Sequence, residues 1–252
     1  MQCKNCNSSL RSDFGYCPVC GAKVIRNRLT LKNVWHDLSF QVFNLDNTLF
    51  KTLKHLLSKP ALVAETYISG ARKKYMNPIS FFAIAVTLSG IMFWVLKDIY
   101  GLKLMEQTNQ NFDGDKIFKY QALLSYFSVP FYALSTFLVF IDIRKYNFTE
   151  HLVIALYIVG AYSFVQVFVS ILLFGLFDLS YFWFTNIFIV AILLYWFYTL
   201  KKLHHIKFWN TLVRLLLFLP MYFISAFIPT MAIMIFMLIS GEYNLQDFAP
   251  KN

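Results

Sequence analysis

The chain has 252 residues, of which 58% are hydrophobic and 14% charged, and its formal net charge is +10. A soluble domain has about 45–50% apolar and about 25% charged residues, so this chain lacks the polar surface needed to face water everywhere. The composition excludes an ordinary soluble protein. It predicts an integral membrane protein of the helical type, because backbone groups in lipid must be hydrogen-bonded within each segment.

The first segment, residues 1–22, contains all four cysteines. They form two C-x2-C pairs separated by ten residues, and paired knuckles of this kind are typical of a closed tetrahedral zinc site. Gly21, directly after the second pair, permits a positive φ where the chain turns under the sulfur. About twenty residues cannot build a core, so the metal would supply the folding energy of this zinc ribbon. The expected zinc ligands are Cys3, Cys6, Cys17 and Cys20.

Zinc is preferred to disulfides because of the compartment that the sequence indicates. Disulfides would require an oxidising environment. No apolar signal segment precedes the first cysteine pair, so we expect the N-terminus to stay in the reducing cytoplasm.

Two segments connect the ribbon to the apolar part of the chain. Residues 23–33 are basic and are interpreted as a linker; nucleic-acid contact is disfavoured because no aromatic platform accompanies the cations. In residues 34–78, apolar side chains recur at steps of three and four from Val34 to Leu57, with an interruption near 44–48. This amphipathic pattern suits a helix at the membrane interface or one packed against the bundle.

The stretch 58–78 marks the transition from water to membrane. Pro60 predicts the first turn of a helix, and Gly70 predicts its C-terminal cap. Asn77 and Pro78 predict the N-cap and first residue of the first membrane span. Three cations between these helices are expected at the headgroup level, where they either fix the orientation of the chain or contact anionic lipids. They are Arg72, Lys73 and Lys74.

Five hydrophobic runs follow within residues 79–240, and we expect them to form a helical membrane bundle. The last run contains Pro220 and Pro229 and is predicted to tilt, kink or divide. An N-terminus in the cytoplasm places the C-terminal tail, residues 241–252, outside. Eighteen of the 23 Lys and Arg residues then lie on the cytoplasmic side, as expected for a membrane protein without nucleic acid. The predicted spans are 79–97, 122–143, 152–174, 181–200 and 211–239.

Ionisable residues are few within the spans, and the sequence contains no P-loop, G-x-S-x-G or H-E-x-x-H motif. Two cytoplasmic loops carry neighbouring polar pairs, Glu150 with His151 and His204 with His205. If these pairs approach each other in space, they make a metal or acid–base site. The alternative is that they are interfacial polar residues at helix ends.

A set of motifs resembles an uncharacterised bacterial family of zinc-ribbon membrane proteins, a domain-of-unknown-function family. The set consists of the C-x2-C…C-P-x-C-G ribbon, the stretch FNLDNTLFKTLKHLLSKPALVAETYISGARKKYMNPISF and a following bundle. The resemblance is strongest over residues 3–82, with Ala61 where the family is expected to have Gly, and it implies an architecture without an established activity. A fainter likeness is to the Yip1-like membrane proteins, which would suggest membrane organisation or trafficking.

The sequence therefore predicts an all-α, multi-pass protein of the inner membrane with amphipathic interface helices and a small cytoplasmic zinc ribbon. We expect a non-enzymatic scaffold or adaptor whose ribbon docks a cytoplasmic protein partner, because a closed zinc site is joined to a bundle poor in buried charge. One alternative is a transporter or lipid-moving protein, since Pro130, Pro220 and Pro229 interrupt spans. A second is a membrane enzyme that uses the Glu and His residues of the two loops.

Overall fold

The structure is a computed structural model, and it describes residues 2–3, 6–21, 48–70, 74–101, 119–176 and 181–243. The chain divides into two compact units, Met1–Asp46 and Asn47–Asn252. The described part of the second unit is helical, and that of the first contains an isolated antiparallel bridge between Gln2 and Ser9. Within the described residues, the predicted all-helical class is confirmed.

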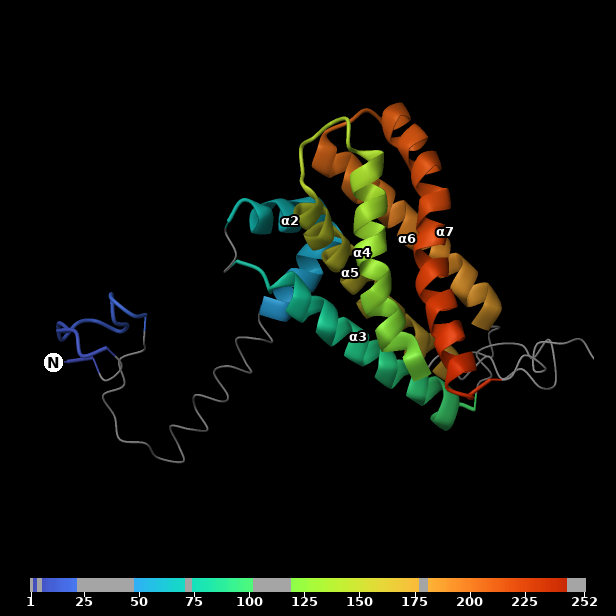
Figure 1. The fold of residues 1–252 in the computed structure, drawn as a ribbon, viewed down its shortest axis with the longest axis horizontal. Helices are drawn as coiled ribbons and strands as arrows, with labels where there is room; N and C mark the ends of the chain where they lie inside the picture. Colours follow the sequence, from blue (N-terminus) through green and yellow to red (C-terminus); the bar gives the residue numbers. More distant parts are fainter. Residues whose placement is uncertain are drawn as a thin grey trace, which may run out of the picture. The chain divides into compact units, whose positions relative to one another are not determined.

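Five helices of the second unit are long and apolar enough to cross a membrane, as the sequence predicts. The chain is therefore a multi-pass membrane protein by the length and composition of its helices. These helices are α3 (Pro78–Trp94) with its π-helical continuation η1 (Val95–Ile99), α4 (Gln121–Val139), α5 (Phe148–Leu176), α6 (Tyr181–His204) and α7 (Phe208–Ile239) (Figure 1).

The helix ends differ from the predicted boundaries by a few residues. α4 ends at Val139 and residues 140–143 form a turn, whereas the predicted span continued to residue 143. α6 continues to His204 and α7 begins at Phe208, so the connection between them is shorter than expected. α7 runs through both of its prolines as a single helix and does not divide.

We call the described residues 48–70 and 74–77, which precede α3, the elbow. The expected helix caps are present around it. Pro60 occupies the first turn of α2 (Pro60–Ile68), and Gly70 follows that helix with a φ of +103°. Asn77 is the N-cap of α3, where its side chain accepts a hydrogen bond of 2.9 Å from the backbone N–H of Ile79. The basic linker and the first part of the amphipathic segment lie outside the described residues.

The elbow is fixed to the bundle from two sides. The backbone N–H of Met76 donates to Thr52 Oγ1 at 2.9 Å, and the hydroxyl of Tyr157 donates to the Met76 carbonyl at 2.6 Å. Thr52 belongs to the helical residues 48–58, and Tyr157 to α5. These bonds satisfy both backbone groups of Met76, a buried residue that lies outside regular structure.

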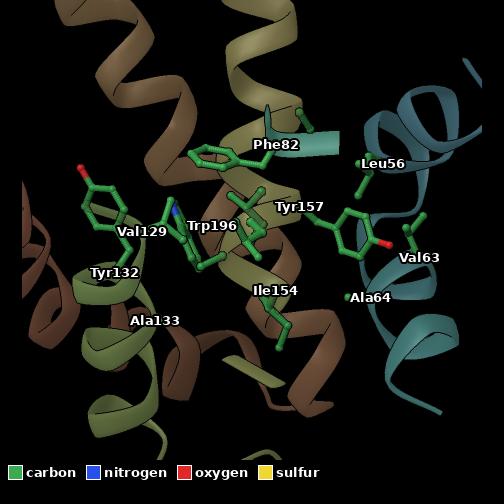
Figure 2. Close-up of a cluster of buried hydrophobic side chains, with 14 of the residues drawn as sticks. Leu56, Val63, Ala64, Phe82, Val129, Tyr132, Ala133, Ile154, Tyr157 and Trp196 are labelled. Atoms are coloured by element: carbon green, nitrogen blue, oxygen red, sulfur yellow. The ribbon is translucent and has the colours of Figure 1, made fainter. Parts of the chain in front are cut away.

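The main hydrophobic core joins the elbow helices to the spans (Figure 2). The ring of Tyr157 projects from α5 toward Leu56, Val63 and Ala64, which come from residues 48–58 and α2. On the other side of α5, Trp196 of α6 is fully buried. The described part of the amphipathic segment therefore packs against the bundle with its buried face.

Two helix pairs define the bundle. α3 packs closely along α5 because Gly160 leaves room for Phe81: a Cβ at residue 160 would lie 2.9 Å from the Phe81 ring. α4 and α7 run side by side (Figure 1), and their interface contains a 2.8 Å hydrogen bond between the Ser135 and Ser225 hydroxyls. We call the end of the bundle formed by residues 140–147 and 205–207 the basic end, because Arg144, Lys145, Lys201, Lys202 and Lys207 lie at or next to it.

Candidate metal centre and the polar end of the bundle

The four cysteines of the first unit converge on one point. Their Sγ atoms all lie within 4.8 Å of one another. Cys3 Sγ lies 3.7 Å from Cys20 Sγ, and Cys6 Sγ lies 3.6 Å from Cys17 Sγ, while no disulfide joins any of them. The arrangement brings together all four predicted ligands, and it can hold a metal ion.

The two knuckles have matching backbone turns. The N–H of Asn7 donates to the Cys3 carbonyl at 2.9 Å, and the N–H of Gly21 donates to the Cys17 carbonyl at 2.8 Å. Both residues follow the second cysteine of their knuckle and have positive φ angles, 57° for Asn7 and 70° for Gly21. Gly and Asn are the residues that adopt this conformation most readily, which is why each knuckle can turn under its sulfur atoms.

The Ser8 side chain contacts two of the four sulfur atoms. Its hydroxyl oxygen lies 3.1 Å from Cys6 Sγ and 3.2 Å from Cys17 Sγ. The hydrogen bond from Ser8, with a backbone N–H from Cys20, lowers the pKa of Cys17 to about 6. Because the thiolate is the form that binds metal, this thiol is ready for coordination at neutral pH.

Two of the four residues of the predicted polar cluster meet inside the basic end. The rings of His151 (α5) and His204 (α6) are nearly parallel, with centroids 6.0 Å apart, and both residues are buried. His151 Nδ1 lies 3.1 Å from Thr136 Oγ1, and His204 stacks on Phe140 at 4.0 Å. Neither ring nitrogen of His204 has a hydrogen-bond partner, which is costly for a buried imidazole.

The other two residues of that cluster have separate roles. Glu150 accepts a 2.7 Å hydrogen bond from the N–H of Asn147, and the N–H of Glu150 donates to the Asn147 side chain at 2.9 Å. This reciprocal pair is a capping box at the start of α5. His205 is exposed and lies 3.9 Å from the Glu65 carboxylate. Among the described residues, the cysteines form the one group of three or more potential ligands.

An ion pair between Arg214 and Asp142 connects α7 to the end of α4. Arg214 donates to both carboxylate oxygens of Asp142, one of them at 2.8 Å, and to the Val139 carbonyl at the C-terminus of α4. The hydrogen bond from Arg214 holds the pKa of Asp142 below its usual value.

The Glu65 carboxylate, on α2, binds two side chains of the basic end. Glu65 Oε1 accepts from the Tyr146 hydroxyl at 3.1 Å and from Lys145 Nζ at 3.3 Å. Lys145 also donates to the Leu203 carbonyl near the end of α6. Burial, together with the Glu65 charge, raises the pKa of Tyr146 above its usual value, so this hydroxyl stays a donor. Three segments distant in sequence are joined by this set of bonds.

Of the three predicted headgroup contacts, Arg72 and Lys73 lie outside the described residues. Lys74 Nζ lies 5.5 Å from the centroid of the Tyr75 ring, and Lys51 lies on the same ring at 6.0 Å. The Tyr75 hydroxyl is 2.8 Å from His55 Nδ1. Cations from the helical residues 48–58 and from the bend before α3 therefore lie around one aromatic side chain.

The model of the family described as "Protein of unknown function (DUF3667)" matches residues 46–90. The chain is similar to that family over the elbow and the first half of α3. The matched range contains the capping residues Pro60 and Asn77 and the hydrogen bonds at Met76, and it lies outside the cysteine module. No curated protein and no solved structure matches the chain. The predicted likeness to an uncharacterised family is thus confirmed for these residues.

Proposed function

We propose that the chain is a membrane-anchored adaptor of the inner membrane, with a zinc-bound cysteine module in the cytoplasm that docks a partner protein. The observation that carries the proposal is the preformed set of four sulfur atoms. Tetrahedral zinc with bonds of about 2.3 Å to sulfur requires sulfur–sulfur distances of about 3.8 Å. The 3.6 and 3.7 Å separations of the paired Sγ atoms fit that requirement.

Four thiolates fill every position of a tetrahedral ion, and a closed site of this kind is structural rather than catalytic. The module therefore serves best as a small recognition surface. Two large apolar side chains support this role, because Tyr16 is 64% exposed and Val19 is 72% exposed. Tyr16 directly precedes the second knuckle and Val19 lies within it, so the metal would fix the loop that presents them.

Proximity labelling tests the docking proposal in cells. A biotin ligase fused to the full chain is expected to label a defined set of cytoplasmic proteins, and Tyr16→Ala/Val19→Ala should lose that set while keeping its zinc. A matched variant with two exposed apolar residues of α7 changed, Phe223→Ala/Ile224→Ala, should label the wild-type set. An unchanged set in the Tyr16/Val19 variant would contradict docking through this surface.

The juxtaposed histidines favour a membrane enzyme or metal site as the second candidate. Imidazole nitrogens suit zinc, copper, iron and nickel, and the two unpartnered nitrogens of His204 need some partner. The test uses a variant with all four cysteines changed to serine, so that metal bound elsewhere is visible. About one equivalent of metal that disappears on His204→Ala would support this candidate, and a metal-free serine variant would remove it.

A further inference from the structure

A groove lies between α5, α6 and the helical residues 48–58. Its volume is about 160 Å³, and it is open on one side. Leu57 lines it from the helical residues, Ala161 and Val165 from α5, and Phe188, Ala191 and Tyr195 from α6. The two alanines leave the space, because larger side chains at these positions would fill the gap between the helices.

The lining of the groove is apolar and gives a water molecule few hydrogen-bond partners. Two tyrosines, Tyr162 and Tyr195, also line the groove, and the Tyr195 hydroxyl donates to the Leu56 carbonyl at 2.9 Å. A water molecule needs two to four polar partners, and an apolar cavity of about 150 Å³ stays dry and accepts a hydrocarbon such as benzene. The groove is therefore suited to a hydrocarbon of about six carbons.

The groove also lies where hydrocarbon is available. Its α5 and α6 residues fall within the two segments Phe148–Phe174 and Trp183–His204, both of which are long and apolar enough to span a membrane. The neighbouring outward faces carry exposed Phe168, Ile187 and Leu194. Lipid chains, rather than water, surround such faces in a bilayer.

Two of the helical segments that line the groove carry exposed lysines on the same faces as lining residues. Lys54 is exposed and precedes Leu57 by three residues, which places both on one face of the helical residues 48–58. Lys202 is exposed and follows Tyr195 by seven residues, two helical turns or about 10.5 Å along the same face of α6. An apolar groove with exposed cations on two of the segments that line it matches a molecule with a hydrocarbon tail and an anionic head.

We propose that this groove holds part of one acyl chain of an anionic phospholipid, with the headgroup held near Lys54 and Lys202. The acyl chain enters through the open side of the groove, and the headgroup stays beside the two lysines. This inference rests on the membrane spans and the groove, and it is independent of the docking role of the cysteine module.

Native mass spectrometry of the full-length protein released from detergent tests the site. The wild type is expected to retain one phosphatidylglycerol, whereas Ala161→Phe and Ala191→Phe, each of which places a ring in the groove, should lower the retained fraction at least about tenfold. Leu172→Phe, at an exposed position of α5 outside the groove, is the control and should retain it. Equal retention in the filled and control variants would overturn the proposal.

The headgroup part has its own test. Lys54→Gln/Lys202→Gln should lower the preference for phosphatidylglycerol over phosphatidylcholine several-fold, while Lys207→Gln, which changes an exposed cation at the basic end, should leave it unchanged. An unaltered preference in the double variant would contradict an anionic head at these lysines.

A labelling experiment on the wild type avoids any effect of substitution on folding. Phosphatidylglycerol with a photoreactive group on its acyl chain should attach to peptides that contain Val165 and Phe188 in preference to the exposed α7 face at Phe223 and Phe227. Adducts spread evenly over all lipid-facing helices would show that the groove holds no particular lipid.

Discussion

Arg214 shows how one side chain can secure two helices at the membrane surface. It lies in the second turn of α7, yet it donates to the last carbonyl of α4 and to Asp142 beyond it. Its guanidinium also lies 5.1 Å from the Phe140 ring centroid. A planar guanidinium suits this combination because it donates in two directions and stacks on an aromatic face at the same time.

The ion pair between Asp142 and Arg214 predicts that the stability of the folded protein depends on pH. Since the folded-state pKa of Asp142 is lowered, its contribution is present above the unfolded pKa of about 3.9 and is lost as the pH falls through the folded value. Asp142→Asn should therefore lower the melting temperature at pH 7 and have a smaller effect at pH 3. Equal losses of melting temperature for Asp142→Asn at both pH values would contradict this account.

Replacement of His204 is expected to raise the stability of the protein. Two buried ring nitrogens without partners each carry a desolvation penalty of about 1–3 kcal/mol. His204→Phe keeps an aromatic ring against Phe140 and removes both nitrogens, so the metal-free protein should melt at a higher temperature. The control is His205→Asn at an exposed position with a φ of 52°, which Asn tolerates, and it should change little. A lower melting temperature for His204→Phe would indicate that the ring nitrogens are in use.

At the scale of elements, the packing of α3 on α5 depends on a missing side chain. Phe81 is fully buried and occupies the space beside Gly160, so its ring cannot retreat from a new methyl group. Phe81 also contacts Phe164 at 5.0 Å between ring centroids, which extends the contact along α5. The elbow that begins α3 is fixed to the same helix through Tyr157.

Two glycine substitutions separate packing from helix propensity. Gly160→Ala should lower the free energy of unfolding, because the new Cβ would lie 2.9 Å from ring atoms of Phe81. Gly90→Ala meets its nearest neighbour at 3.9 Å and should gain about 0.5–1 kcal/mol from helix propensity. Unfolding of both variants in mixed micelles gives the comparison, and a stabilising Gly160→Ala would exclude the close approach of α3.

Features fixed by neighbouring residues could be predicted from the sequence, and features fixed by distant pairs could not. Pro60, Asn77 and Gly21 act within one turn of chain, so their structural roles could be predicted from spacing. The bond between Arg214 and Asp142 joins residues 72 positions apart, and the sequence offers many other opposite charges. The approach of His151 to His204 was one of two readings of the loops, because hydropathy locates helix ends without giving the helix that lies beside them.

At the scale of the whole molecule, the described residues contain five helices long enough to span a membrane, and the predicted topology then has residues 1–22 in the cytoplasm and residues 241–252 outside. All cysteines lie in the first unit, so labelling of the native cysteines shows on which side of the membrane this unit lies. With the metal removed by a chelator, a membrane-impermeant maleimide should label inverted inner-membrane vesicles and not intact spheroplasts. A cysteine-free variant carrying Ser240→Cys, beyond α7, should show the reverse pattern, and labelling of the native cysteines from outside would contradict the proposed orientation.

The adaptor proposal depends most on a metal in the cysteine module. The most direct measurement is the zinc content of the purified full-length protein. It should contain one zinc per chain, lose it on Cys17→Ser and keep it on Tyr16→Ala/Val19→Ala, because only the first change removes one of the four converging sulfur atoms. A protein purified without metal, or one that keeps its zinc after Cys17→Ser, would contradict the account.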